Sequence, residues 1–366
     1  MKRIDLLVSF LIFLLICIPE LVFSQHMAAY LDYRDRFMVF DRGETRELEN
    51  YKVNSFQVGG LCIGYHSYAD DLKVYYNGSV RTLEHMSPSN YVVTDYLMGY
   101  SMYSVLKVFD KGEVKTLCTN TNGYIVEDSL IAYYDEVQQV LNVYSEGETR
   151  TIEDGLLQWP IRSYTSGDNI LAYITEFDNK FKIYYRGELQ VVDDNVRETV
   201  YKAGRDIVGY MNLVTNAFMV FYKGKFYDLE AFAPRSFQMG DEMMAYVNDQ
   251  GDFKIFENGE LVTISTFEPE FYQLTDSTLV FVEDNFLKTW CDGQVRVIER
   301  YVPDVYRISE RTIAYIDVNK RIKALRRCEP LNISYEMVNS LDMIRNLIIF
   351  NIGVNTTKIW YNGKLY

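Results

Sequence analysis

The chain has 366 residues, with 37 Lys and Arg against 51 Asp and Glu, and its net charge is −14. Phosphate backbones and anionic membrane surfaces repel such an acidic protein, which argues against nucleic acid as a partner. The 31 Tyr, 21 Phe and 3 Trp are a high aromatic content, and only 7 Pro and 21 Gly argue against disorder. So many rings favour a β-rich fold, because half-buried pleated positions accommodate them best.

Residues 1–24 have the pattern of a secretory signal peptide. Lys2-Arg3 supply the positive end, Leu6–Ile18 form an apolar run, and Val22-Phe23-Ser24 offer a cleavage site. The run of about 13 residues is short for a bilayer span, which needs roughly 20. An uncleaved anchor and a lipoprotein modified at Cys17 are the alternatives. We therefore expect an exported protein, periplasmic, on the cell surface or extracellular, with no membrane span after cleavage.

A hairpin pattern recurs through the remaining segment, residues 25–366. In Leu72–Gly78, apolar and polar residues alternate up to an Asn-Gly turn, and a second alternating segment follows. The turn glycine recurs at positions 43, 78, 112, 147, 187, 224, 259, 293 and 363, and Cys328 takes the missing place. Spacings of 34 to 40 residues indicate ten copies of a unit of about 35 residues.

Each copy contains four short β patterns. In residues 160–193 the predicted strands are 161–165, 170–174, 181–185 and 188–192, with turns between them. Prolines at 88, 160, 234, 269 and 303 precede the first strand of their copies, where a missing N–H is tolerated. Helical periodicity is nearly absent. The chain is therefore predicted to be all-β, a β-propeller of about ten four-stranded antiparallel blades.

The repeats resemble those of secreted bacterial β-propeller proteins of unassigned activity, over residues 27–366. This resemblance implies the fold and carries no active site. The alternatives for the arrangement of the copies are one ten-bladed ring, two five-bladed rings, a smaller ring with irregular ends, and an open β-solenoid. The first copy lacks a first strand unless residues 25–28 supply it, and the chain stops inside the last fourth strand. A blade that combines strands from both termini is therefore a further alternative for closing the ring.

Aromatic residues recur at the end of each second strand and again on each third strand. We predict that they form the core between blades, the alternative being a platform for stacking ligands. The second-strand residues are Tyr65, Tyr100, Tyr133, Tyr173, Tyr210, Tyr246, Phe281, Tyr315 and Phe350. The third-strand residues are Tyr75, Phe109, Tyr144, Tyr184, Phe221, Phe256, Trp290 and Trp360.

An acid recurs five residues before the second-strand aromatic in six copies. Because the first strand of a propeller blade is innermost, these turns should surround one mouth of the central channel. A ring of carboxylates there could bind Ca2+ or a cationic partner; the alternative is that Asp is simply favoured in turns. The candidate ligand-binding residues are Asp95, Asp128, Asp168, Asp241, Asp276 and Glu310, with Asp206 one place out of register.

Lysine recurs on the third strands, where we interpret it as a solvated face or a guard against strand aggregation. The alternative is a contact with an anion or a polysaccharide. These residues are Lys73, Lys107, Lys182, Lys254, Lys288, Lys323 and Lys358.

Copy nine departs from the pattern, since Arg326-Arg327 replace the usual turn and Cys328 stands where Gly belongs. The edge of the ring formed by copy nine is therefore the second candidate contact surface. The alternative is that the sequence of this copy has drifted without a functional reason.

Four cysteines remain after signal cleavage: Cys62, Cys118, Cys291 and Cys328. Scattered thiols are commonly buried apolar residues. One disulfide is compatible with export, but the spacing assigns no connectivity.

We predict a non-catalytic exported propeller that binds a protein or glycan through one face of the ring. The alternative is a carbohydrate-active hydrolase or lyase that uses carboxylates near the channel mouth. A structural part of an envelope assembly is a third interpretation. Only three His are present and none stands in a recognisable triad order. No cofactor is expected apart from the Ca2+ considered above.

Overall fold

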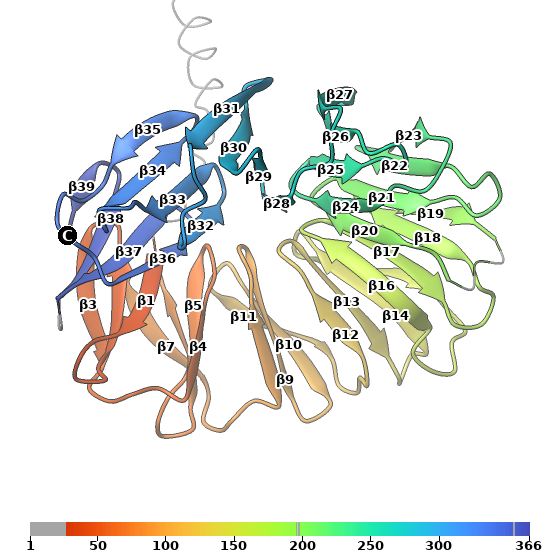
Figure 1. Ribbon diagram of the computed structural model, residues 1–366. Coiled ribbons are helices and arrows are strands. Elements are labelled where there is room, and N and C mark those ends of the chain that lie inside the picture. The colour runs from red at the N-terminus through yellow and green to blue at the C-terminus, as the bar shows by residue number, and fades with distance from the viewer. Residues whose placement is uncertain (1–26, 195, 197, 354–355) are drawn as a thin grey trace, which may run out of the picture.

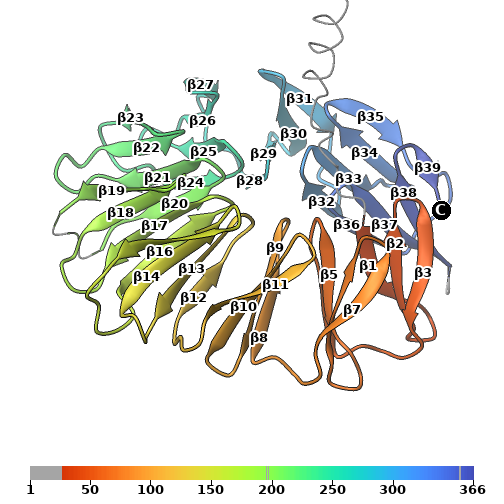
Figure 2. The same cartoon turned by 180° about the vertical axis from the view of Figure 1, so that it is seen from behind.

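The computed structural model describes residues 27–194, 196, 198–353 and 356–366. Within these ranges 39 strands form ten antiparallel sheets arranged in a ring, as Figure 1 shows and Figure 2 repeats from behind. The prediction of an all-β propeller with ten blades is confirmed. The described part of the chain contains no helix with the length and hydropathy of a membrane span. The predicted signal peptide, residues 1–24, lies outside the described residues.

The blades follow one another along the chain. Blades one to three contain β1 (Met27–Leu31), β2 (Phe37–Asp41), β3 (Glu44–Glu49); β4 (Ser55–Val58), β5 (Cys62–His66), β6 (Leu72–Tyr76), β7 (Ser79–Glu84); and β8 (Asn90–Val93), β9 (Leu97–Met102), β10 (Val105–Asp110), β11 (Glu113–Cys118). Blades four to six contain β12 (Tyr124–Val126), β13 (Leu130–Asp135), β14 (Val140–Ser145), β15 (Glu148–Glu153); β16 (Ile161–Gly167), β17 (Ile170–Thr175), β18 (Phe181–Tyr185), β19 (Glu188–Asp193); and β20 (Tyr201–Gly204), β21 (Ile207–Met211), β22 (Phe218–Tyr222), β23 (Lys225–Glu230).

The remaining four blades repeat this order. Blades seven and eight contain β24 (Ser236–Met239), β25 (Met243–Val247), β26 (Phe253–Glu257), β27 (Glu260–Ser265); and β28 (Phe271–Thr275), β29 (Thr278–Glu283), β30 (Phe286–Cys291), β31 (Gln294–Glu299). Blades nine and ten contain β32 (Tyr306–Ser309), β33 (Thr312–Ile316), β34 (Ile322–Arg326), β35 (Glu329–Asn332); and β36 (Ser340–Ile344), β37 (Leu347–Ile352), β38 (Thr356–Tyr361), β39 (Lys364–Leu365).

The hairpin between the third and fourth strands explains why the turn glycine recurs. In blade five, Arg186 and Gly187 at its centre have φ angles of 49° and 86°. A two-residue turn with both central residues at positive φ matches the twist of the strands, and Gly adopts this conformation without steric cost. The strand positions predicted for residues 160–193 are confirmed within two residues at each end.

Each pair of neighbouring blades shares one hydrophobic cluster, so the predicted core between blades is confirmed. Between blades six and seven, for example, Phe218 packs against Phe237 and Tyr246 with ring centroids 5.0 and 5.4 Å apart. Ten such clusters occur among the described residues, one per interface around the ring. A blade thus buries both of its faces against its neighbours.

The tenth cluster closes the ring between the first and last blades. It joins Ala28 and Phe40 of blade one to Leu347 and Ile359 of blade ten. Figure 1 shows the strands of these two blades side by side. Phe40 also contacts the ring of Tyr366, with centroids 5.3 Å apart. Two five-bladed rings and an open solenoid are therefore excluded. Residues 27–31 form the second strand of blade one, not its first, and no described sheet mixes strands from both termini.

A repeated polar triad accompanies the cluster at five interfaces. A glutamate at the end of one blade's fourth strand accepts hydrogen bonds from a tyrosine and a lysine of the next blade. At Glu230, the distances to Tyr246 Oη and Lys254 Nζ are 2.8 and 2.7 Å. The triads are Glu49–Tyr65–Lys73, Glu84–Tyr100–Lys107, Glu153–Tyr173–Lys182, Glu230–Tyr246–Lys254 and Glu299–Tyr315–Lys323.

A β-bulge places each of these glutamates. In blade six the pairing shifts between Phe218 and Met219, so that Phe218 lies opposite Glu230 and Leu229 is the extra residue. The same shift precedes Glu49, Glu84, Glu153 and Glu299. Because a bulge bends its strand, it can re-aim the last side chain. The carboxylate consequently reaches the neighbouring blade.

The interpretation of the recurring lysines as a solvated face or an aggregation guard is therefore wrong. Lys182 is only 8% exposed and pairs with Glu153 at 3.0 Å. The two lysines outside the triads are also paired, Lys288 with Glu283 at 2.6 Å and Lys358 with Glu336 at 3.1 Å. Burial beside an acceptor carboxylate makes these lysines part of the blade interface.

The cysteines divide into two kinds. Cys62 and Cys118 are free and buried, as predicted, and burial raises the pKa of the Cys62 thiol to about 12. Cys291 and Cys328 form a disulfide, so the expectation of a buried thiol is wrong for this pair. The bond joins the end of β30 in blade eight to the hairpin of blade nine. Cys328 occupies the glycine position of that hairpin at a φ of 68°.

We expect Glu230→Ala to lower the free energy of unfolding by about 1–3 kcal/mol, because it leaves the Lys254 ammonium and the Tyr246 hydroxyl without their shared acceptor. Urea unfolding followed by tyrosine fluorescence measures the change. The matched control is Glu188→Ala, which removes an exposed glutamate at the start of β19. Equal midpoints for the two variants would show that the triads do not stabilise the interfaces.

Candidate functional site

The turns between first and second strands surround one mouth of the ring. First strands of neighbouring blades contact one another, as β20 does β24 and β24 does β28, which places them innermost. The turns are joined directly by backbone hydrogen bonds, from Ser129 N–H to the Asp168 carbonyl at 2.8 Å and from Asp241 N–H to the Asp276 carbonyl at 2.7 Å. All six predicted acids lie in these turns. We call this set of turns the channel mouth.

The charges of neighbouring acids raise the pKa of several predicted carboxyl groups at the mouth. Burial, and then the neighbouring carboxylates, raise the pKa of Asp128 to about 6. The pKa of Asp168 is raised to about 6 by burial and by the charge of Asp128. Asp276 contributes to both shifts and also to that of Asp241. The mouth therefore gathers acids from blades four, five, seven and eight, and their charges oppose the ionisation of Asp128, Asp168 and Asp241.

One guanidinium group lies among these carboxylates. Arg205, in the turn of blade six, is 2.6 Å from an oxygen of Asp241 and 3.7 Å from an oxygen of Asp168. Its charge lowers the pKa of Asp241, but burial outweighs this effect and the pKa is still raised to about 6. A single cation therefore does not neutralise the group.

Asp95 has a different environment. It pairs with Arg345, which lies in the turn between β36 and β37 of blade ten. This contact spans the mouth from blade ten to blade three, past blades one and two. Burial lowers the pKa of Arg345 to about 10. Asp95 thus has an arginine from a distant blade as its partner.

Glu310 and Asp206, the remaining acids of the predicted ring, have different surroundings. Burial raises the pKa of Glu310, and Asp276 adds to the shift. Asp206 points away from the group: it is 4% exposed and accepts hydrogen bonds from Tyr185 Oη at 2.6 Å and Asn169 Nδ2 at 2.7 Å. Its displacement by one place in the sequence therefore corresponds to a different, structural role.

Two of the carboxylates also hold neighbouring blades together. Asp128 Oδ1 accepts the backbone N–H of Asp95 at 2.9 Å, and Asp276 Oδ2 accepts that of Glu310 at 2.7 Å. A turn-forming Asp would bond within its own turn, whereas these two reach across a blade boundary. Preference for Asp in turns is thus an incomplete explanation of the repeated acid.

Three further charged residues of these turns were not predicted from the sequence: Arg205, Arg345 and Glu127. The two arginines occupy the repeat position of the acids, five residues before Tyr210 and Phe350, so alignment of the copies contains the signal. Glu127 precedes Asp128 and accepts a 2.5 Å hydrogen bond from Ser166, and burial raises its pKa. No group of three or more His, Cys, Asp or Glu in the described ranges is arranged to hold a metal ion.

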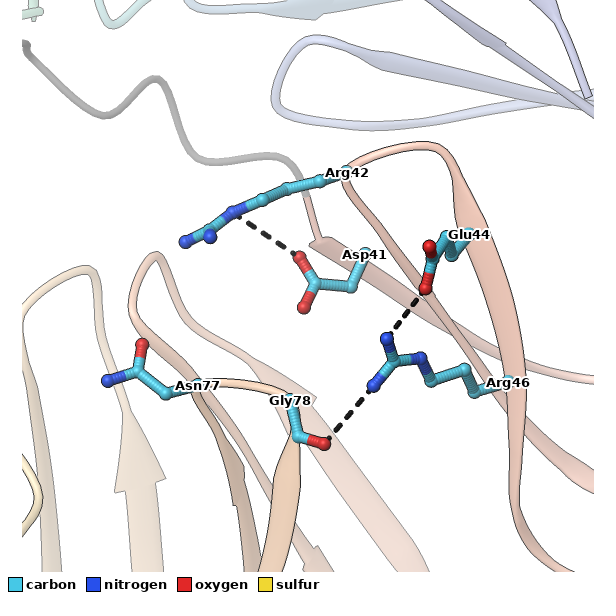
Figure 3. Close-up of a pocket in the computed structure, with 6 residues that line it drawn as sticks. All are labelled: Asp41, Arg42, Glu44, Arg46, Asn77 and Gly78. Atoms are coloured by element: carbon cyan, nitrogen blue, oxygen red, sulfur yellow. Dashed lines mark hydrogen bonds and ion pairs between the residues drawn. The ribbon is translucent and has the colours of Figure 1, made fainter.

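Cavities on the same face lie between the outer hairpins of neighbouring blades and not over the acids. Figure 3 shows the one between blades one and two, with a volume of about 430 Å3. There Arg46 bridges Glu44 at 2.6 Å and the Gly78 carbonyl at 3.2 Å, and Arg42 is 3.7 Å from Asp41. These charges satisfy one another, so this cavity is not favoured as a binding site.

We expect Asp128→Asn to raise stability at pH 7.5 by about 1–3 kcal/mol and to raise it by less at pH 4.5. A carboxyl whose pKa is raised in the folded state stabilises the fold while it is protonated, and this contribution is lost as pH rises from about 4 through about 6. The amide keeps an acceptor for Asp95 N–H and removes the charge. Urea unfolding at both pH values gives the comparison.

The control is Asp249→Asn, which removes an exposed acid from the turn between β25 and β26. A stability difference for Asp128→Asn that does not depend on pH would contradict the assignment of a raised pKa to this carboxyl.

Several solved structures are similar to this chain at low sequence identity. The computationally designed Ika8 protein is 13% identical, covering 92% of this chain and 99% of its own, with a TM-score of 0.36. Prp20p from Saccharomyces cerevisiae is 11% identical, covering 58% and 74%, with a TM-score of 0.32. The CRINKLY WD40 ectodomain of the Arabidopsis thaliana receptor kinase ACR4 is 9% identical, covering 66% and 96%, with a TM-score of 0.33. We draw no conclusion from these values.

Comparison with curated proteins gave no match. The family described as the 10-bladed beta propeller domain matches residues 21–366, which includes every blade described above. The chain therefore belongs to the 10-bladed β-propeller domain family.

Proposed function

We propose that this protein is an exported, non-catalytic scaffold that binds a protein or glycan partner through the face of the ring that carries the channel mouth. The observation that carries the proposal is the excess of negative charge at the mouth. Asp128, Asp168 and Asp241 all have a pKa raised to about 6, with Arg205 as their shared cation. Such a group gains free energy when a further positive charge approaches.

A cationic side chain of a partner is the ligand that best fits this environment. The carboxylates are partly exposed, 29% for Asp168 and 18% for Asp241, so an ammonium or guanidinium group can reach them from solvent. Ca2+ is the second candidate, because carboxylate oxygens are its usual ligands. The separation of the acids over four blades favours the larger organic cation.

The disulfide supports export. Cys291–Cys328 joins two blades, and disulfides persist mainly in oxidising compartments outside the cytosol. Residues 1–24, whose sequence has the pattern of a signal peptide, also support export.

A hydrolase or lyase at the mouth is less well supported than a scaffold. Cavities of 430, 440 and 340 Å3 lie on this face, and none is lined by the six predicted acids. The acids instead contact backbone N–H groups, Arg205 and Arg345. Glycoside hydrolysis needs two carboxyl groups facing one substrate. We therefore keep the binding scaffold as the proposed function.

The test is isothermal titration of the purified full chain with hexalysine in low-salt buffer at pH 7.5. We expect binding that weakens as salt is added, because exposed charges are screened. The variant Asp128→Asn/Asp168→Asn/Asp241→Asn should bind at least about tenfold more weakly, a loss of about 1.4 kcal/mol. Titration with CaCl2 under the same conditions tests the second candidate.

The matched control, Asp154→Asn/Asp249→Asn/Asp304→Asn, removes the same charge from exposed positions in connections that lie outside the channel mouth. A pull-down from the native envelope fraction with both triple variants then tests the natural partner. Equal hexalysine affinity in the two variants, or retention of the same partners by both, would contradict the proposal.

A further inference from the structure

Blade nine differs in charge from the rest of the protein. Residues 300–328 contain eight Arg and Lys and three Asp and Glu, whereas the whole chain has a net charge of −14. Two of these cations, Arg311 and Arg327, line a cavity of about 440 Å3 between blades seven, eight and nine. Neither side chain has an ion pair or hydrogen bond with another residue of the described ranges. Unpaired guanidinium groups beside a cavity favour an anionic ligand.

Blade nine departs from the repeat at two positions that line the cavity. The other nine blades carry Tyr, Phe or Trp three residues before the turn glycine, and blade nine carries Leu325. The smaller side chain leaves space beside Trp290 of blade eight. In addition, Cys328 replaces the glycine and is bonded to Cys291. The disulfide fixes the backbone next to Arg327, so the cationic side of the cavity is held in place before a ligand binds.

The opposite side of the cavity supplies hydrogen-bond acceptors. Glu257 accepts a hydrogen bond from Trp290 Nε1 at 3.0 Å, which orients the indole ring. Asn258 and Glu260, both exposed, lie at the same edge of the cavity. These acceptors would repel a ligand that carries only negative charge. A ligand with hydroxyl groups as well as an anionic group can satisfy both sides.

From this arrangement we infer that the cavity binds an acidic sugar, a pyranose ring that carries a carboxylate. The carboxylate pairs with Arg311 and Arg327, the hydroxyls donate to Glu260 and Asn258, and the apolar face of the ring packs on the wall formed by Trp290 and Leu325. The volume of about 440 Å3 accommodates one or two sugar units.

This inference rests on the proposed binding role of the face, but the two sites use different residues and ligands of opposite charge. The hexalysine titration tests the channel mouth and the sugar titration tests the blade-nine cavity. Either proposal can fail without the other.

The experiment is isothermal titration of the full chain with trisaccharides of galacturonate, glucuronate and mannuronate, each paired with its neutral counterpart lacking the carboxylate. We expect at least one acidic trisaccharide to bind at least about tenfold more tightly than its neutral counterpart. Arg311→Gln and Arg327→Gln should each reduce that affinity about tenfold, and Glu260→Gln should reduce it several-fold.

The matched control is Lys111→Gln, which removes an exposed cation from the same hairpin position in blade three, where φ is 49° against 47° at Arg327. Circular dichroism confirms that each variant is folded. Binding of pentaglutamate as tightly as the acidic sugars would overturn the inference in favour of an acidic peptide. Failure of all three acidic trisaccharides to bind, or an effect of Lys111→Gln equal to that of Arg327→Gln, would overturn it outright.

Discussion

Packing between consecutive blades is the interaction on which the whole structure depends. A four-stranded sheet of about 35 residues is too small to be stable alone, so each blade must cover both of its faces. The second-strand aromatics of blades two to ten are buried at these interfaces. At five interfaces the tyrosine hydroxyl and a lysine of the same blade share a glutamate of the preceding blade. The interface therefore combines apolar burial with a directional polar contact, and the latter fixes how neighbouring blades align.

Closure of the ring brings charged residues that are spread along the sequence close together at the channel mouth. Residues that are about 35 positions apart in sequence occupy equivalent places around the channel mouth. An acid repeated at one position of the unit thereby becomes a group of interacting carboxylates, as the effect of Asp276 on the pKa of Asp128 and of Asp168 shows. The same geometry brings Arg345 of blade ten to Asp95 of blade three, 250 residues earlier. Two exceptions in the repeat, Arg205 and Arg345, thus decide how much of that charge is neutralised.

The fold could be predicted because the repeated unit is short and its hairpin turn has a strict steric requirement. Glycine at positions such as 187 and 224 marks each turn with both central residues at positive φ, and the alternation on either side locates the strands. The polar contacts between blades were harder to predict from the sequence. Lys73 or Lys254 on a strand face looks solvated in the sequence, because the bulge that turns Glu49 or Glu230 toward it leaves no local sequence pattern. Blade number followed from counting copies, but closure required the contacts of Phe40.

The location of the candidate site could be predicted from the sequence, but the partners of its charged residues could be predicted only in part. Periodicity placed the six acids on one face. It did not show that Asp95 is paired with Arg345 while Asp168 and Asp241 share Arg205, since this depends on distances across the mouth. The Cys291–Cys328 bond likewise follows from the contact of blades eight and nine, because 37 residues of separation alone indicate no pairing.

Hydrogen–deuterium exchange of the full chain tests the closed ring most directly. In a closed ring every blade has two neighbours, so the strands of blades one and ten should be protected to the same degree as those of blades four and five. In an open array the two end blades lack one neighbour and fray. Rapid exchange confined to residues 27–49 and 340–366 would contradict the ring, and with it the gathering of acids at a channel mouth.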